Sequence, residues 1–389
     1  MRVFGAVVLA ALLTVAAGAS TGLARAASST VTAIDLGTLG GTFSETHAMN
    51  ASGQVVGESA VASFGIHAFS WTQAGGMVDL GTLGDGSFST ARAVNASGQV
   101  VGESNLAPGG ATHAFSWTQS GGMVDLGTLG GTFSTAYGVN ARGEVVGEST
   151  TAAGEFHAFS WTKAGGMVDL GTLGGTGSSA GAVSPSGQVV GNSELAGNVA
   201  AHAFSWTPQG GMVDLGTLGG DVSTAVDVTP SGQVIGVSDV VPGGPFVPQH
   251  AFSWTQKGGM VDLGTLGGDT SLADDVNASG EVVGLSDIAP DGPFHAFLWT
   301  EAGGMVDLGT LGGAGSSAVA VNASGQVVGD ATTAAGQGHA FSWTRTGGMV
   351  DLGTLGGTDS RANAVNGRGE VAGSSFTTGG EFHAALWRT

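Results

Sequence analysis

Short apolar runs separated by turn-forming residues recur along nearly the whole chain. Between residues 77 and 117 these runs are 77–80, 91–95, 99–104 and 113–117, and Gly, Asn and Ser fill much of the sequence between them. Short runs bounded by such residues at intervals of roughly 8–12 positions are typical of antiparallel strands. No window shows the 3.6-residue apolar spacing of an amphipathic helix. The pattern therefore predicts four short strands in this stretch and an all-β protein with almost no helix.

This four-strand pattern returns at intervals of 44 to 48 residues. A His-Ala-Phe or His-Ala-Ala triplet begins at His67, His113, His157, His202, His250, His295, His339 and His383. Asp-Leu-Gly-Thr-Leu-Gly begins at Asp35, Asp79, Asp125, Asp169, Asp214, Asp262, Asp307 and Asp351. Four strands in about 45 residues is the size of one β-propeller blade. Eight copies predict an eight-bladed β-propeller with four antiparallel strands in each blade.

The two ends of the repeat region complement each other. Residues 31–36 match the Met-Val-Asp-Leu run but follow no strand of their own blade, whereas residues 383–387 lack the run that should come next. Pairing them would complete the eighth blade and remove two exposed sheet edges. The rival architecture, an open solenoid, would need polar capping repeats, and the sequence offers none. We therefore predict one propeller domain over residues 27–389, closed by pairing of the N-terminal strand with the C-terminal strands.

The repeated motifs also carry a family resemblance. His-Ala-Phe, Asp-Leu-Gly-Thr-Leu-Gly-Gly and Val-Asn-Ala-Ser-Gly-Gln-Val-Val-Gly resemble the bacterial HAF family of extracellular repeats. The resemblance covers residues 31–389, and the last copy departs from it with Ala385 in the Phe position. It implies an exported repeat protein. It implies no defined activity, so no catalytic residue follows from it.

Residues 1–26 are predicted to be a secretion signal peptide. Arg2 precedes an almost wholly apolar segment, 3–17, and Ala24-Arg25-Ala26 places small residues where a signal peptidase cleaves. The apolar run is short for a membrane-spanning helix, although a retained anchor is the alternative. We expect a secreted protein, extracellular or periplasmic, that leaves the membrane once the signal is cleaved.

Composition narrows the classes of partner. The net charge of −20 would repel nucleic acid and anionic membranes, so we expect neither as a partner. The chain has no cysteine, so the fold does not depend on disulfides. Its acidity either keeps a Gly-rich, strand-rich protein soluble or attracts divalent cations or basic partners, and we expect a monomer. An extracellular protein or glycan is the expected partner.

Most of the polar and aromatic residues that recur in every repeat are interpreted as structural. One His per blade at a constant offset places the eight histidines on a ring, where they cannot converge on one ion. Their predicted role is hydrogen bonding within or between blades, with the repeated Asp and Ser of the same unit as partners, and the repeated Asp residues are interpreted as structural as well. The eight tryptophans are interpreted as packing between blades. The four Asn-Ala-Ser sequons are explained by tight turns such as 95–98. Because no motif for a catalytic nucleophile, phosphate-binding loop or metal site is present, the sequence predicts no catalytic residue, metal site or cofactor.

One column of the repeat changes from copy to copy. Its members, two places before each Val/Met-(Asn/Ser/Thr), are His47, Arg92, Tyr137, Gly181, Val226, Asp274, Val319 and Asn363. By analogy with WD-repeat propellers this column lies on the innermost strand, beside the central channel. Mixed polar groups at a channel mouth make a plausible binding site. The hypothetical ligand-binding residues are His47, Arg92, Tyr137, Asp274 and Asn363, and the rival interpretation is drift at an exposed position.

The loops between the third and fourth strands also differ in length. The longest spans residues 238–249, and the copy in the sixth repeat includes residues 290–294. These loops and the Gly-rich connections should share one face, for which Phe246, Asp291 and Phe294 are the candidate contacts. Four aspartates would make that face acidic: Asp85, Asp221, Asp269 and Asp359. Calcium at these carboxylates is an open alternative, but no spacing defines a site.

Three classes of function are compatible with these features. The favoured one is a secreted, non-catalytic binding or scaffold protein that engages a protein or glycan on its loop-bearing face. The second is a propeller-type lyase or glycosidase that uses Asp274 with His47 or Arg92 at the channel mouth. The third, a purely structural surface component, would need an oligomerising patch that the sequence does not reveal.

Overall fold

The computed structural model describes residues 31–244 and 247–388. This part of the chain contains 32 strands and no helix, so the predicted all-β class is confirmed. It also contains no helix long and apolar enough to cross a membrane. The predicted signal peptide, residues 1–26, lies outside the described residues, as does Phe246.

The strands occupy four positions in the repeat, counted from the inside outward. The innermost strands are β2 (Gly40–Met49), β6 (Ser89–Val94), β10 (Gly130–Val139), β14 (Gly174–Val183), β18 (Ser223–Val228), β22 (Ser271–Val276), β26 (Gly312–Val321) and β30 (Gly356–Val365). The second strands are β3 (Val55–Val61), β7 (Val100–Asn105), β11 (Val145–Thr151), β15 (Val189–Leu195), β19 (Val234–Asp239), β23 (Val282–Asp287), β27 (Val327–Thr333) and β31 (Val371–Thr377). The third strands are β4 (Ile66–Thr72), β8 (Thr112–Thr118), β12 (Phe156–Thr162), β16 (Ala201–Thr207), β20 (Gln249–Thr255), β24 (Phe294–Thr300), β28 (Gly338–Thr344) and β32 (Phe382–Arg388). The outer strands are β1 (Thr32–Asp35), β5 (Gly76–Asp79), β9 (Gly122–Asp125), β13 (Gly166–Asp169), β17 (Gly211–Asp214), β21 (Gly259–Asp262), β25 (Gly304–Asp307) and β29 (Gly348–Gly353).

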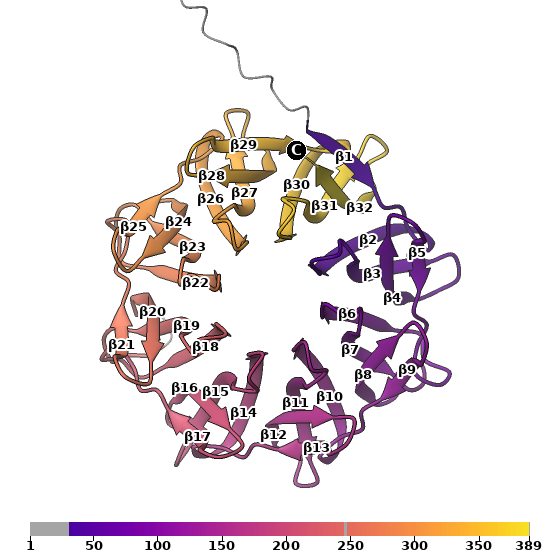
Figure 1. The fold of residues 1–389 in the computed structure, drawn as a ribbon, viewed down its shortest axis with the longest axis vertical. Helices are drawn as coiled ribbons and strands as arrows, with labels where there is room; N and C mark the ends of the chain where they lie inside the picture. The colour runs from indigo at the N-terminus through magenta and orange to yellow at the C-terminus, as the bar shows by residue number, and fades with distance from the viewer. Residues whose placement is uncertain (1–30, 245–246, 389) are drawn as a thin grey trace, which may run out of the picture. The chain divides into compact units, whose positions relative to one another are not determined.

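Each set of four strands pairs in antiparallel order, as the sequence predicted. The simplest groups are β14-β15-β16-β17 and its three successors. Two pairs of groups are joined into eight-stranded sheets through a single parallel pair each, Phe43 with Phe382 and Phe133 with Thr112. Figure 1 shows the groups arranged around a common centre, with the innermost strands nearest to it.

The outer strand of the last group comes from the other end of the repeat region. β1 pairs antiparallel with β32, and Ile34 lies opposite Leu386. The backbone N–H of Leu36 donates to the carbonyl of Ala384 at 3.0 Å. The first and last strands therefore share one sheet.

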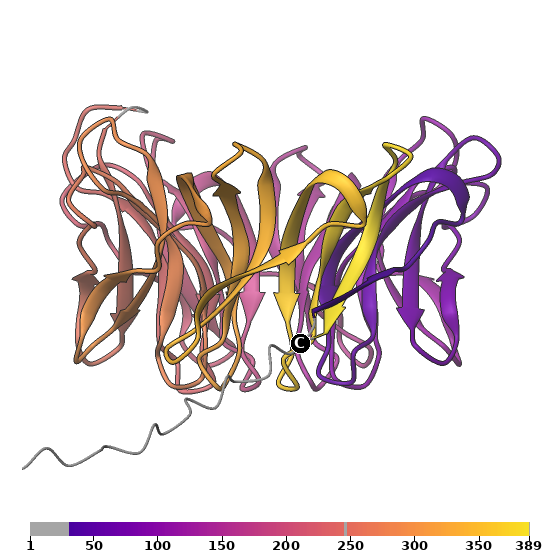
Figure 2. The same cartoon turned by 90° about the horizontal axis from the view of Figure 1, so that it is seen from above.

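Connections lie at two opposite ends of the strands (Figure 2). Gly40 pairs with Val61, so the Gly-rich connection and the loop after the second strand share an end, as predicted. The tight Asn turns, such as the one closed by the bond from Gly98 N–H to the Asn95 carbonyl, lie at the other end. In five repeats the innermost strand is longer than expected, because it already begins at two consecutive glycines of the Gly-rich connection.

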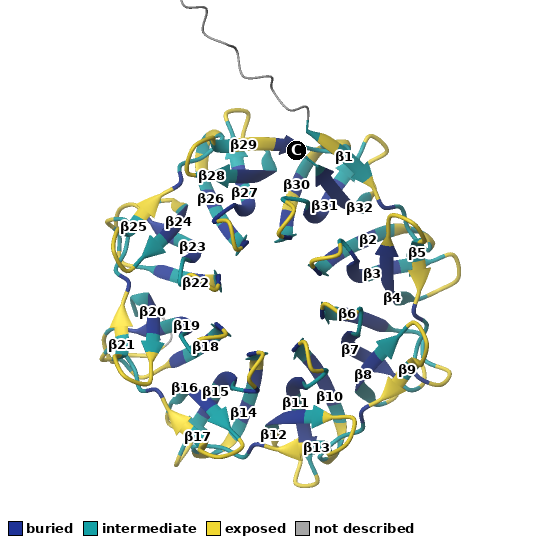
Figure 3. Cartoon of the chain, viewed as in Figure 1, coloured by how far each residue is buried: buried dark blue, intermediate teal, exposed yellow. Residues whose placement is uncertain are grey.

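The hydrophobic core lies between neighbouring sheets rather than in one central mass. Figure 3 shows that the second and third strands are largely buried, whereas the outer strands are largely exposed. In one of these interfaces, Val101 and Ala114 of one four-strand group pack with Val145 and Phe159 of the next group and with Leu126 of the connection between them. The third strand supplies a fully buried Phe in seven groups, because a large aromatic side chain fills the space between twisted sheets.

A buried serine ties each sheet to its neighbour. The Ser89 hydroxyl accepts a hydrogen bond from Ala68 N–H at 2.8 Å and donates one to the Gly81 carbonyl at 2.6 Å. Between the last and first groups, Ser44 accepts from Ala384 N–H at 2.9 Å. These bonds satisfy backbone groups that would otherwise be buried without partners.

Candidate functional site

The eight repeated histidines are each engaged by an aspartate of the same sheet. His67 Nδ1 lies 2.9 Å from Asp79, and the same pair recurs at His113–Asp125, His157–Asp169, His202–Asp214, His250–Asp262, His295–Asp307, His339–Asp351 and His383–Asp35. The pairs are spread one to a sheet, on the third and outer strands. This geometry agrees with the structural interpretation of the repeated His and Asp.

The variable column meets at one cavity. All eight of its residues line a space of about 540 Å³ at the centre of the described structure: His47, Arg92, Tyr137, Gly181, Val226, Asp274, Val319 and Asn363. Each comes from a different innermost strand. The structure thus brings together residues that lie more than 300 positions apart in the sequence.

A β-bulge in the innermost strand places two consecutive residues on this cavity. Thr46 pairs with Gly57 and Ala48 pairs with Val56, so His47 has no partner on β3. A bulge of this kind interrupts the strict alternation of faces along a strand. Both His47 and Ala48 consequently line the cavity. The same register shift occurs at Arg92, between Ala91 and Ala93.

Three polar column residues lie in consecutive sheets and are oriented by specific contacts. His47 Nδ1 lies 2.9 Å from the Ala91 carbonyl. Arg92 donates to Glu103 at 2.6 Å, and its guanidinium lies 5.5 Å from the ring centre of Tyr137. The Tyr137 hydroxyl donates to Glu148 at 3.0 Å. Burial, followed by the negative charge of Glu148, raises the pKa of Tyr137, so its hydroxyl stays protonated.

Two aspartates that the sequence interpretation missed lie on the opposite side of this cavity. Asp227 and Asp275 occupy the second bulge position, where the other six repeats have Ala or Gly. Asp275 accepts hydrogen bonds from the backbone N–H groups of Val276 at 2.8 Å and Val321 at 2.7 Å. Their signal in the sequence was the replacement of a small residue by Asp in two adjacent copies of one column.

The carboxyl groups on this side perturb one another. Burial, together with the nearby Asp275 carboxylate, raises the pKa of Asp227 to about 8. The same two causes raise the pKa of Asp274 to about 7. The pKa of Asp275 is also raised by burial. Two neighbouring carboxylates are disfavoured when both are charged, so the protonated form of Asp227 is favoured near neutral pH.

Replacing Asp227 with Asn should make stability less dependent on pH. A folded-state pKa of about 8 lies above the unfolded value of roughly 4. Between these two pKa values the native protein binds more protons than the unfolded chain, so its stability falls as pH rises from about 4 to about 8 and levels off above that. Between pH 5 and pH 9 the unfolding free energy of D227N, measured by urea denaturation, should fall on the order of 4 kcal/mol less than that of the wild type.

A matched control is Ala182→Asn, which places the same amide at the equivalent bulge position of the repeat just before that of Asp227. It should show the full wild-type loss between the two pH values. A constant stability difference between D227N and wild type from pH 5 to pH 9 would contradict the raised pKa of Asp227.

The candidate contacts of the loop-bearing face lie away from this cavity. Phe294 pairs with Asp287 at one end of β23, whereas Asp275 pairs with Val283 near the other. Four residues of strand separate the two levels, or about 13 Å. Asp291 and Phe294 are exposed at the loop end. The predicted cavity residues and loop-face residues therefore form two separate places on the molecule.

Comparisons with known proteins give distant likenesses only. No protein-family model matches the chain, and no curated protein matches it in sequence. The β-propeller domain of the trilobed protease from Pyrococcus furiosus is 11% identical, with a TM-score of 0.48 over 80% of this chain and 96% of that one. TolB from Acinetobacter baumannii is 12% identical, with a TM-score of 0.41 over 65% of this chain and 62% of TolB. A puromycin hydrolase is 13% identical, with a TM-score of 0.47 over 90% of this chain and 59% of the hydrolase. At this level of similarity the comparisons assign no activity, substrate or partner.

Proposed function

We propose that this chain is an exported, non-catalytic binding protein built as a closed eight-bladed β-propeller, with its principal ligand site at the central cavity. The pairing of β1 with β32 and the bond between His383 and Asp35 support closure. The constant 44 to 48 residue period supports eight equivalent blades. The signal-like N-terminal segment and the HAF-type motifs support export.

The observation that carries the proposed site is the concentration of non-repeating polar groups on one cavity. The surrounding repeat is nearly constant, yet the column that lines the centre holds His, Arg, Tyr, Asp and Asn in different blades. A volume of about 540 Å³ lies within the usual range of small-ligand sites. Random sequence drift at an exposed position would not by itself supply a glutamate partner for both Arg92 and Tyr137.

The chemistry of the lining favours a polar ligand. Asn363 Oδ1 and Arg92 Nε are buried and have no hydrogen-bond partner among the described residues. A ligand rich in hydroxyl groups, or a polar side chain of a protein partner, would satisfy such groups and recover the cost of burying them. A sugar residue of a glycan, or the tip of an extracellular protein loop, therefore fits the cavity. The loop-bearing face then acts as scaffold, in contrast to the role expected from loop length alone.

The test is a screen of the full chain against glycans and secreted proteins, with and without calcium, followed by variants. Combined alanine replacement of His47, Arg92 and Tyr137 should weaken binding of the best ligand at least about tenfold, because it removes several buried polar contacts. Phe294→Ala, on the loop-bearing face, should leave the affinity unchanged. Weaker binding by Phe294→Ala and unchanged binding by the triple variant would place the binding site on the loops. If the triple variant has a changed melting temperature, the three residues are replaced one at a time.

A second candidate function is favoured by the carboxyl pair. Asp227, Asp274 and Asp275 place carboxyl groups with raised pKa values at the cavity, and a lyase or glycosidase uses such a group as its general acid. If the protein is such an enzyme, Asp274→Asn should abolish turnover of polysaccharide substrates while leaving their binding intact. Substrates that bind and are recovered unmodified by the wild type would retain the non-catalytic proposal.

A further inference from the structure

A glutamate of the second strand lies behind the variable column in three consecutive sheets. Glu58, Glu103 and Glu148 occupy the same register position, opposite Glu45, Thr90 and Thr135 of the innermost strands. In the second and third sheets the column residue satisfies this glutamate: Arg92 donates to Glu103 and Tyr137 donates to Glu148. These two sheets show what the position requires, which is a donor or a positive charge.

The first sheet has no such donor. Its column residue is His47, and no hydrogen bond or ion pair to the Glu58 carboxylate is present among residues 31–244 and 247–388. A backbone carbonyl only accepts, so the contact at 2.9 Å between His47 Nδ1 and the Ala91 carbonyl places the proton of a neutral ring on Nδ1. His47 Nε2 then carries a lone pair and cannot donate to Glu58. A cation at this place would neutralise the half-buried Glu58 carboxylate and accept the lone pair of His47 Nε2.

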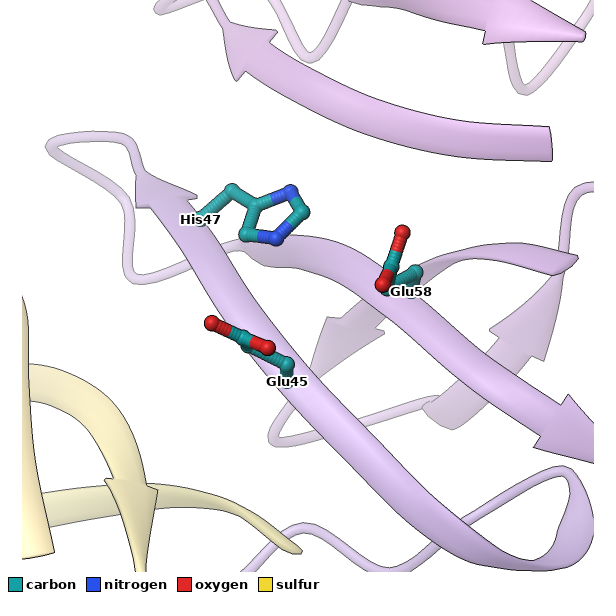
Figure 4. Close-up of side chains that lie close together, drawn as sticks. All are labelled: Glu45, His47 and Glu58. Carbon is teal, nitrogen blue, oxygen red and sulfur yellow. The ribbon is translucent and has the colours of Figure 1, made fainter. Parts of the chain in front are cut away.

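Figure 4 shows the side chains of Glu45 and His47 on β2 and of Glu58 on β3 lying close together around one space. One ligand atom from each of the three lies within 4.8 Å of the others. Glu45 is also paired with Arg361 of the last repeat through Oε1, which leaves its second oxygen free. All three residues are half-buried, so the group is accessible without being fully solvated.

We propose that Glu45, His47 and Glu58 bind a divalent transition-metal ion beside the central cavity, which His47 lines, with Zn²⁺ as the reference ion. One imidazole and two carboxylates are a ligand set that Zn²⁺ accepts, at about 2.0–2.2 Å from each atom. Calcium is a poor match, because it takes six to eight oxygen ligands and does not favour imidazole.

Two neighbours prepare the group for an ion. The Ala91 carbonyl fixes the tautomer and orientation of His47, which is the usual role of an outer partner of a ligating histidine. Arg361 holds Glu45 in place while compensating part of its charge. The other seven repeats cannot reproduce the set, since none of them has His at the column position. The site therefore has a stoichiometry of one ion per chain.

The test is calorimetric titration of Zn²⁺ into the metal-stripped full chain. We expect one saturable site, weakened at least about tenfold in Glu58→Gln and in His47→Gln. Glu103→Gln and His67→Gln are the matched controls, since Glu103 is the equivalent residue paired with Arg92, and His67 belongs to the repeated His–Asp pairs. Both controls should keep the site.

Unfolding temperatures of the metal-free variants show whether each one folds, and Glu45→Gln serves as a second variant should Glu58→Gln fail. Equal Zn²⁺ binding by the wild type, E58Q and H47Q, or the absence of a saturable site in the wild type, would overturn the proposal. Calcium that displaces Zn²⁺ stoichiometrically would overturn the assigned ion class. The titration contains no organic ligand, so its outcome is independent of the proposed binding function.

Discussion

Replacing Gly102 with Ala should destabilise the protein strongly, although the change adds only one methyl group. Gly102 lies in the middle of β7, where it pairs with Ala91 on one side and Phe115 on the other. A Cβ atom at this position would lie 1.9 Å from the Thr90 carbonyl oxygen. No side-chain rotation can relieve a clash with backbone, so the two strands must separate. We expect a loss of about 3 kcal/mol or more in unfolding free energy, measured by urea denaturation.

The matched control is Gly181→Ala on the innermost strand of the fourth repeat. A Cβ there meets no atom closer than 3.8 Å, and its backbone needs no positive φ. This variant should lie within about 0.5 kcal/mol of the wild type. Equal stability losses in the two variants would mean that the close approach of strands at Gly102 is not maintained in solution.

The same close approach explains part of the high glycine content that the sequence interpretation assigned to turns. In each four-strand group, one glycine of the second strand would place a Cβ atom 1.9–2.0 Å from a carbonyl oxygen of the innermost strand. These glycines are Gly57, Gly102, Gly147, Gly191, Gly236, Gly284, Gly329 and Gly373. Counting Gly in the repeat identifies a constant position, but it does not distinguish a turn from a tight contact between strands. That distinction needs the register of the pairing, which depends on contacts between strands.

The all-β class and the four-strand units were predictable because they depend on local signals. The short apolar runs repeat eight times, and the turn that ends in Gly begins with Asn in six copies and with Ser184 or Thr229 in the other two, so an error in one copy is corrected by the others. The turn at Asn95 forms as expected, since its side chain accepts from the backbone of Ser97 and Gln99. The same side chain also donates to the Asn140 carbonyl of the next sheet at 3.0 Å, a tether that a reading of one repeat could not reveal.

The candidate site was predictable only in part, and the bulge is the reason. Divergence between repeats identified His47, Arg92 and Tyr137, because a symmetric array makes any variable column conspicuous. Regular alternation would turn the adjacent column away from the centre, so Asp227 and Asp275 escaped notice. Glu58 was missed for a related reason. Its position beside His47 depends on the pairing of β2 with β3, and pairing register is a property of the folded sheet.

A disulfide between positions 32 and 388 should form readily and raise stability strongly if the ring is closed as proposed. Thr32 and Arg388 are direct register partners in the pairing of β1 with β32. Partners in an antiparallel pair have Cα atoms about 4.5–5.5 Å apart, within the range that a disulfide spans. The chain has no cysteine of its own, so Thr32→Cys with Arg388→Cys introduces the only two thiols.

The size of the expected effect follows from the length of chain enclosed. A crosslink over about 355 residues removes on the order of 5 kcal/mol of conformational entropy from the unfolded state. Replacing Arg388 removes its hydrogen bonds to Glu370 and Gln73 in both the oxidised and the reduced variant, so this loss cancels when the two forms are compared and lowers only the gain relative to the wild type, to about 3–4 kcal/mol. The measurement is the difference in unfolding free energy between oxidised and reduced protein, with non-reducing electrophoresis to verify a monomeric product.

The control pair is Thr32→Cys with Thr118→Cys. Thr118 ends β8 at the place that Arg388 occupies on β32, but β8 already pairs with its own outer strand, β9. This pair should stay reduced under the same mild oxidation. Failure of the 32–388 pair to form, or formation only as crosslinked dimers, would show that the two terminal strands do not meet within one molecule. The proposed closure would then depend on the remaining contacts between the last and first groups, such as the parallel pair of Phe43 with Phe382 and the bond from Ala384 N–H to Ser44.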